Sequence, residues 1–179
     1  ILLCAAIQYP GSLVPYITLS MKNARRILWA TLHQLDQEFG IGLEFRANDL
    51  TASLSNGSSI ILAGATDYEE IQKLRGPRYG AVILDEVQSM KPSVCRTLVA
   101  DILEPATMDL DGQICAFFTP SASASGYAFD IDHTEDAWMR FHWTMLENPH
   151  LPKAQEWLAT RKAENGWTED TPVYRREYL

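Results

Sequence analysis

The sequence predicts an α/β fold in which helices flank a mainly parallel sheet. Residues 81–84 form a continuous apolar run, and such a run suits a strand that is buried on both faces of a parallel sheet. A helix predicted over 92–104 and a second apolar strand predicted over 113–118 follow it. Strand, helix and strand in this order form a βαβ unit, from which parallel sheets are built.

The residues before this unit predict another strand and a long helix. Residues 14–19 read as a strand whose start is restricted by Pro15. Ser20 suits the N-cap of a helix over 21–39, where apolar residues recur at helical spacing. Gly40 suits the residue that ends this helix.

A hairpin and a short helix are predicted next. Two extended segments, 51–54 and 59–62, flank the Asn-Gly pair at 56–57, and Asn-Gly is the strongest short hairpin signal. Asp67 suits the N-cap of a short helix over 68–74.

Pro92 suits the first turn of the helix predicted over 92–104, and Pro105 is expected to end that helix.

The last third of the chain lacks further apolar strands. A helix over 153–165 is predicted beyond the core. We therefore expect a core over 1–146 and a helical linker or lid over 147–179.

Composition places the chain among globular proteins. Its 179 residues allow one sizeable core with an appendage, and no apolar run is long enough to cross a membrane. The net charge of −8 argues against a surface coated for nucleic-acid binding. Cys4, Cys95 and Cys115 are widely spaced in apolar surroundings. We expect buried free thiols rather than disulfides or a metal site, and a reducing, cytosolic setting.

Two adjacent carboxylates, Asp85 and Glu86, follow the apolar run at 81–84. Open α/β folds bind ligands at the carboxyl ends of their strands. In nucleotide hydrolases the first acid of such a pair holds Mg²⁺ and the second polarises the attacking water. The alternative is that both acids cap the next helix.

Several short segments stand in a fixed order around this pair. They are Leu54-Ser55-Asn56-Gly57-Ser58, Leu74-Arg75-Gly76, Phe117-Phe118-Thr119-Pro120, Asn148-Pro149-His150 and Arg175-Arg176-Glu177-Tyr178. With these segments the chain resembles, over nearly its whole length, the ATPase domain of the large terminase subunit, the motor that packages DNA into phage heads. The strongest element of the resemblance is the spacing from Arg75-Gly76 to Asp85-Glu86 and onward to Thr119-Pro120.

The resemblance implies a role for three residues at the nucleotide. Asp85 takes the Walker B role and serves the Mg²⁺ of bound ATP. Glu86 is the general base or the carboxylate that positions the attacking water, a contribution of about 10²–10⁴-fold in rate. Thr119 belongs to the coupling motif that senses the γ-phosphate, for which a hydroxyl is suited; the alternative for Thr119-Pro120 is a simple strand exit.

The resemblance also implies an arginine that acts on a neighbouring subunit. Arg75 would reach that subunit's ATP and stabilise the transferring phosphoryl group. Arg78 is a competing candidate for this role. The alternative is that Arg75 is a surface residue that pairs with Glu69 or Glu70.

The fold implied is a P-loop NTPase-like fold of the ASCE type, and the function is that of a packaging motor. Such a motor couples hydrolysis of Mg²⁺-ATP to translocation of double-stranded DNA into a prohead. The expected partners are double-stranded DNA, the portal protein and the small terminase subunit. We expect a homo-oligomeric ring in the host cytoplasm and no membrane.

The phosphate-binding loop of such an enzyme is not found in the sequence. No G-x-x-x-x-G-K-[ST] motif and no Gly-Lys pair occurs. In the family this loop precedes a helix that leads to the strand containing Tyr16, so the resemblance implies that residues 1–8 are the remainder of that helix. We expect a fragment that lacks this loop and the nuclease domain, and that binds ATP weakly. The alternatives are another nucleic-acid translocase ATPase, and a non-catalytic docking domain with an NTPase-like fold.

Overall fold

The computed structural model describes residues 1–120, 125–133 and 137–178. Its contacts divide the chain into two units, Ile1–Phe118 and Thr119–Leu179. This division lies earlier in the chain than the boundary expected between residues 146 and 147. The assignment of 147–179 to a linker or lid stays a prediction.

The first unit is built on a six-stranded sheet with the strand order β2-β3-β4-β1-β5-β6. Strands β4, β1, β5 and β6 are parallel to one another, whereas β3 is antiparallel to both of its neighbours, β2 and β4. The predicted mainly parallel sheet is thus confirmed. The strands are β1 (Leu13–Thr18), β2 (Glu44–Arg46), β3 (Thr51–Ser53), β4 (Ser59–Gly64), β5 (Ala81–Leu84) and β6 (Gln113–Ala116).

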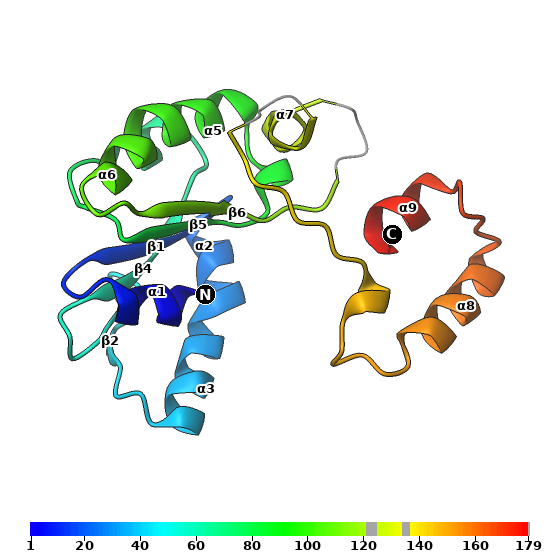
Figure 1. Ribbon diagram of the computed structural model, residues 1–179, viewed down its shortest axis with the longest axis horizontal. Helices are drawn as coiled ribbons and strands as arrows, with labels where there is room; N and C mark the ends of the chain where they lie inside the picture. The colour runs from blue at the N-terminus through cyan, green and yellow to red at the C-terminus, as the bar shows by residue number, and fades with distance from the viewer. Residues whose placement is uncertain (121–124, 134–136, 179) are drawn as a thin grey trace. The chain divides into compact units, whose positions relative to one another are not determined.

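Helices cover both faces of this sheet (Figure 1). Tyr16 and Ile83 belong to one apolar cluster with Ala6 and Leu32, so α1 and α3 pack on their face of the sheet. Helices α5 and α6 lie on the opposite face. All four residues of β5 are buried, as expected for a strand covered on both sides. The helices of this unit are α1 (Leu2–Gln8), α2 (Met21–Ala24), α3 (Ala30–Phe39), α4 (Tyr68–Gln72), α5 (Pro92–Leu98) and α6 (Glu104–Met108).

The helix predicted over 21–39 is confirmed, with one irregular turn inside it. Ser20 caps its start, because the Ser20 hydroxyl oxygen accepts the Asn23 N–H at 3.2 Å. A π-helical turn, η1 (Arg25–Trp29), separates α2 from α3. Gly40 ends α3 in the left-handed conformation at φ 60°, which glycine adopts without steric cost.

The Asn-Gly hairpin is also confirmed. Leu54 N–H donates to the Ser58 carbonyl at 2.9 Å, and Gly57 has the positive φ that the turn requires. Asn56 Nδ2 and Ser58 Oγ donate to the Ala6 carbonyl at 2.9 and 2.6 Å. The turn therefore holds the last turn of α1 against the sheet.

The prediction that Pro105 ends its helix was wrong. Helix α5 continues through a π-helical turn, η3 (Val99–Leu103), into α6. Proline has no N–H to give to the carbonyl four residues earlier, which here belongs to Asp101. Arg75 Nη1 donates to that carbonyl at 2.9 Å. The π-helical spacing and this outside donor explain how the helix passes the proline.

The second unit holds helices α7 (Tyr127–His133), α8 (Ala154–Asn165) and α9 (Pro172–Tyr178), with a short 3₁₀ turn, η4 (Met145–Glu147). The helix predicted over 153–165 is confirmed by α8, which ends at Gly166 with φ 63°. Aromatic rings from α8, α9 and the segment between them contact one another; they belong to Trp157, Trp167, Tyr174 and Tyr178.

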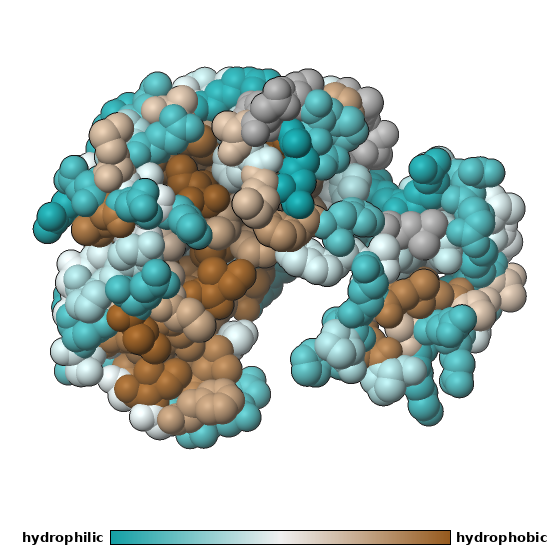
Figure 2. Space-filling view, in the orientation of Figure 1, coloured by the Kyte–Doolittle hydropathy of each residue, from teal (hydrophilic) through white to brown (hydrophobic). Residues whose placement is uncertain are grey.

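Exposure of side chains corrects one expectation. Cys95 is buried and Cys115 half-buried, but Cys4 is exposed, so the prediction of a buried thiol was wrong for Cys4; all three cysteines are free. Cys4 lies on α1, where Ile7 is also exposed, and the exposed Ile1 stands at the N-cap of this helix. Figure 2 shows apolar residues gathered on the surface formed by α1 and α3. Within the described residues no helix is both long and apolar enough to span a membrane.

Candidate functional site

Asp85 and Glu86 leave β5 at the edge where the parallel strands end. Asp85 N–H still donates to the Ile17 carbonyl of β1 at 2.8 Å. On the other side of β5, Phe117 N–H donates to the Leu84 carbonyl at 2.8 Å. Asp85 is half-buried and Glu86 is exposed. The pair therefore lies between β1 and β6 at the carboxyl edge, where α/β folds place ligands.

The Asp85 carboxylate is held by two donors. The Tyr16 hydroxyl on β1 donates to Asp85 Oδ2, and Glu86 N–H donates to Asp85 Oδ1 at 3.0 Å. Burial, and then the hydrogen bond to Asp85, raises the pKa of the Tyr16 hydroxyl well above its ordinary value of 10. Tyr16 therefore keeps its proton and acts as a donor.

Glu86 has a left-handed backbone, with φ 57° and ψ 40°. This conformation costs a non-glycine residue about 1–2 kcal/mol, and among the described residues Leu50 and Asp111 also have a positive φ. At Glu86 it begins a 3₁₀ turn, η2 (Val87–Ser89), which brings Gln88 back toward Glu86. Gln88 Nε2 donates to Glu86 Oε2 at 2.6 Å, so the exposed carboxylate has a fixed partner.

Two buried polar atoms accompany the pair. Thr18 is fully buried at the carboxyl end of β1, next to the position of Asp85 in the sheet register. Within the described residues, Thr18 Oγ1 and Gln88 Oε1 have no hydrogen-bond partner. Buried polar atoms without a partner are uncommon and costly. They add to the polar character of an otherwise apolar sheet edge.

Tyr16, Thr18 and Gln88 were missed by the sequence analysis. Tyr16 is 69 residues from Asp85 in the chain, and only the order of strands brings the two together. The sequence gives no direct signal of that order. Gln88 could have been found, because it follows Glu86 by two residues in a segment that has to turn.

Comparison with solved structures identifies the fold. Neither a protein-family model nor a curated protein sequence matches this chain. The large terminase of a thermophilic bacteriophage superposes with a TM-score of 0.74 at 15% identity, over 99% of this chain and 42% of that one. The same phage protein in complex with ATP-gamma-S gives a TM-score of 0.72 at 16% identity, over 99% of this chain and 41% of that one. The large terminase ATPase domain of Thermus phage P74-26 gives a TM-score of 0.63 at 18% identity, over 96% and 76%.

The fold is that of a large terminase ATPase domain. The predicted resemblance and the P-loop NTPase-like fold class are thereby confirmed at the level of the fold. The chain spans less than half of the phage large terminase chain that it matches.

Within this terminase fold, Asp85 fits a magnesium ligand. Mg²⁺ prefers oxygen ligands and is usually held by one or two carboxylates, with waters and substrate phosphates completing its shell. Each Asp85 oxygen accepts one hydrogen bond and keeps lone-pair capacity for a further contact. Among the residues that the structure describes, no group of three or more His, Cys, Asp or Glu side chains could hold a metal. Asp85 could therefore supply one carboxylate ligand to such a cation.

Arg75 lies away from this pair. It precedes the amino end of β5, whereas Asp85 follows the carboxyl end. Its Nε donates to Gln72 Oε1 at 2.6 Å and its Nη1 to the Asp101 carbonyl. The acceptors of these two bonds are therefore not Glu69 or Glu70, the partners expected under the alternative. One chain does not bring Arg75 together with its own Asp85. The role of Arg75 on a neighbouring subunit stays a prediction.

Arg78 and Thr119 stay predictions as well. Arg78 is exposed on the same segment as Arg75, and among the described residues no hydrogen bond or ion pair engages its guanidinium. Thr119 is the first residue of the second unit. The chain reaches it from β6 through Phe117, whose carbonyl accepts the Val87 N–H at 3.3 Å.

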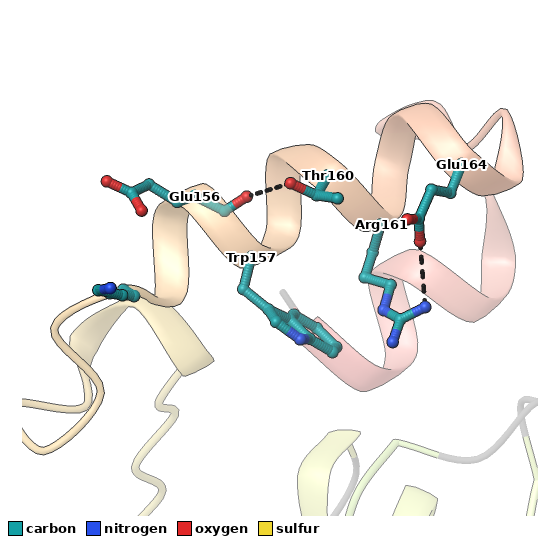
Figure 3. Close-up of a pocket in the computed structure, with 6 residues that line it drawn as sticks. Glu156, Trp157, Thr160, Arg161 and Glu164 are labelled. Atoms are coloured by element: carbon teal, nitrogen blue, oxygen red, sulfur yellow. Dashed lines mark hydrogen bonds and ion pairs between the residues drawn. The ribbon is translucent and has the colours of Figure 1, made fainter.

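A hollow of about 330 Å³ in the second unit is not a comparable site. Figure 3 shows that its labelled residues all come from α8. Their polar groups bond within the helix: Thr160 Oγ1 donates to the Glu156 carbonyl at 3.0 Å, and Arg161 Nη1 donates to Glu164 Oε2 at 3.0 Å. The groups do not converge on a ligand position, so we assign no binding site there.

Proposed function

We propose that this chain is the ATPase part of a large terminase subunit, which couples hydrolysis of Mg²⁺-ATP to translocation of double-stranded DNA into a prohead. The observation that carries the proposal is the Asp85-Glu86 pair at the carboxyl end of β5, with each carboxylate held by a neutral donor. Its setting in a terminase ATPase fold supports the assignment.

The two acids divide the chemistry. Asp85 would hold Mg²⁺, directly or through water, and a cation bound there would neutralise charge on the phosphates. Glu86 is exposed toward solvent and orients the attacking water or takes its proton. The Gln88 amide keeps the Glu86 carboxylate in place without adding charge.

The proposal includes assembly into a ring. Arg75 and Arg78 lie before the amino end of β5, away from their own Asp85, which supports a contribution to the ATP site of the next subunit. A guanidinium supplied in this way is worth about 10³–10⁵-fold in rate. The proposed partners are double-stranded DNA, the portal protein and the small terminase subunit, in the cytoplasm of the host.

The test uses the full-length product of the gene, because these 179 residues contain no Gly-Lys-Ser/Thr loop. We expect Mg²⁺-dependent release of phosphate from ATP. We expect Glu86→Gln to lower turnover by about 10²–10⁴-fold and to leave ATP binding intact. Glu38→Gln, an exposed acid on α3, is the matched control and should change neither.

The outcomes separate the hypotheses. Full turnover in Glu86→Gln would contradict the general-base role. A full-length product that neither binds nor hydrolyses ATP would favour the non-catalytic docking domain. Hydrolysis without translocation of DNA into proheads, in a packaging assay with purified components, would favour another nucleic-acid translocase.

A further inference from the structure

A buried tyrosine reaches the Asp85 carboxylate from the neighbouring strand. Tyr16 is 4% exposed and pairs with Ile83 in the β1–β5 register. Because side chains alternate along a strand, Tyr16, Ile83 and Asp85 lie on one face of the sheet. The Tyr16 hydroxyl donates to Asp85 Oδ2. The contact thus follows from strand pairing and not from a flexible surface side chain.

The Tyr16 ring is packed in the apolar core of the first unit. It belongs to the apolar cluster that includes Ala6 of α1, Ala24 of α2 and Ile83 of β5. A ring packed in this way cannot swing without disturbing its neighbours. Its hydroxyl is therefore a fixed point from which Asp85 is held.

The two donors to Asp85 act on different oxygens. Tyr16 uses Oδ2, the Glu86 N–H uses Oδ1, and the Asp85 N–H is bound to Ile17. Backbone position and carboxylate plane are both fixed by these bonds. Partners that hold a metal-ligating carboxylate in this way raise metal affinity, since the ligand is already oriented when the cation binds.

We propose that Tyr16 is a positioning residue for Asp85, whose hydroxyl orients the carboxylate for the divalent cation of the bound nucleotide. The proposal rests on the proposed function, in which Asp85 holds that cation. The competing explanation is structural: a buried tyrosine hydroxyl needs an acceptor, and Asp85 is the nearest one. Under that explanation removal of the hydroxyl would affect folding stability alone.

Tyr79 is a matched control for this difference. It is fully buried in the same unit, and its hydroxyl donates to the Leu74 carbonyl at 2.7 Å. It lies before the amino end of β5, while Tyr16 meets the residue after the carboxyl end. Tyr16→Phe and Tyr79→Phe each remove one buried hydroxyl and keep the ring, but only the first change touches Asp85.

The experiment measures Mn²⁺ binding by electron paramagnetic resonance, with ADP present, in the full-length product of the gene. We expect Tyr16→Phe to bind Mn²⁺ about 10- to 100-fold more weakly than the wild type. Affinity for ADP without metal should not change. Tyr79→Phe should match the wild type in Mn²⁺ affinity and lose a similar amount of thermal stability. In an Asp85→Asn background, Tyr16→Phe should cause no further weakening, because the two residues act as a unit.

Each contrary result has its own meaning. Unchanged Mn²⁺ affinity in Tyr16→Phe, with normal binding by the wild type, would overturn the positioning role and leave the proposed function intact. Equal weakening in both tyrosine variants would overturn it too, as a general effect of destabilisation. Absence of Mn²⁺ binding by the wild type, or wild-type affinity in Asp85→Asn, would overturn the proposed function and this inference with it.

A second measurement covers the case in which Tyr16→Phe does not fold. The wild-type protein labelled with ¹³C at the tyrosine ζ carbon is titrated with Mg²⁺ in the presence of ADP. We expect the Tyr16 resonance to shift, since its hydroxyl bonds to the carboxylate that holds the cation. The Tyr79 resonance should stay unchanged. A Tyr16 resonance that does not respond would overturn the inference.

Discussion

Gln88 Nε2 donates to Glu86 Oε2 at 2.6 Å, and this bond joins two residues of one tight turn. The other end of the Gln88 amide is buried, and its Oε1 has no donor among the described residues. An unsatisfied buried acceptor costs about 1–3 kcal/mol. Gln88 thus gives up local stability while holding the carboxylate that we assign to water activation, as is common at functional sites.

We predict that Gln88→Met separates the stability cost of the unpaired Gln88 oxygen from the effect of the Gln88 amide on the Glu86 carboxylate. Methionine has a similar length but lacks both the donor and the unpaired oxygen, so the free energy of unfolding should stay the same or rise by about 1 kcal/mol. ATP turnover should fall about tenfold, since Glu86 loses its orienting partner. Denaturant unfolding and phosphate release measure the two quantities. Gln34→Met, an exposed change on α3, is the control. Turnover at the wild-type level would show that Gln88 does not position Glu86.

The backbone of Glu86 supports a second prediction. Glycine adopts φ 57° without the penalty of about 1–2 kcal/mol that an L side chain incurs there. Glu86→Gly and Glu86→Ala both remove the carboxylate, but only the glycine variant relieves the strain. We expect both variants to lose turnover. We expect the free energy of unfolding, measured by denaturant titration, to be about 0.5–1 kcal/mol higher for Glu86→Gly than for Glu86→Ala. The reverse order of stability would contradict the assigned conformation.

The parts of the site that were predictable from sequence are those set by local order. Asp85 and Glu86 follow an apolar strand, and any parallel sheet carries such residues to its carboxyl edge. Their partners were not predictable in the same way. Tyr16 depends on β1 lying beside β5, which is a property of the whole fold.

The errors of the sequence analysis have a similar origin. Pro105 was expected to end a helix, but a π-helical turn and the Arg75 guanidinium accommodate it. Cys4 was expected to be buried among apolar neighbours, yet α1 turns that face to solvent. Local preference gave the helix and the apolar character correctly. Tertiary contacts decided where the helix stopped and which face was covered.

Alkaline pH should destabilise the first unit through Cys95. Burial raises the pKa of the Cys95 thiol from about 9 to about 11. Between these values the unfolded chain loses this proton and the folded chain keeps it, so stability falls as the pH rises from 9 to 11. At pH 10 the loss due to Cys95 should be about 1 kcal/mol, because one pKa unit corresponds to about 1.4 kcal/mol.

The measurement compares free energies of unfolding at pH 8 and pH 10 by urea titration. Cys95→Ala removes this titrating thiol. Its free energy of unfolding should therefore fall less between pH 8 and pH 10 than that of the wild type, whatever its stability at pH 8. Cys4→Ala is the control, since Cys4 is exposed and should leave the difference unchanged. An equal alkaline loss in Cys95→Ala and the wild type would contradict the prediction.

The two arginines before β5 give the last prediction, which concerns action between subunits. Arg75 bonds to Gln72 and to the Asp101 carbonyl, so Arg75→Ala should lower the free energy of unfolding by about 1 kcal/mol. Among the described residues the Arg78 guanidinium makes no such bond, and Arg78→Ala should change stability by less than about 0.5 kcal/mol. If either guanidinium serves the ATP site of the next subunit, its alanine variant should also lose turnover by about 10³–10⁵-fold.

Mixing of subunits tests this directly in the full-length product. Arg75→Ala subunits and Glu86→Gln subunits are each inactive alone under the proposal. In a mixed ring, some interfaces combine an intact arginine from one subunit with an intact Glu86 from the next, so phosphate release should reappear and be greatest near equal proportions. The same mixture with Arg78→Ala decides which arginine acts. Because Arg75→Ala also loses stability, thermal unfolding of each variant ensures that rescue is measured on folded subunits. Absence of rescue at every ratio, with both arginines, would contradict action between subunits.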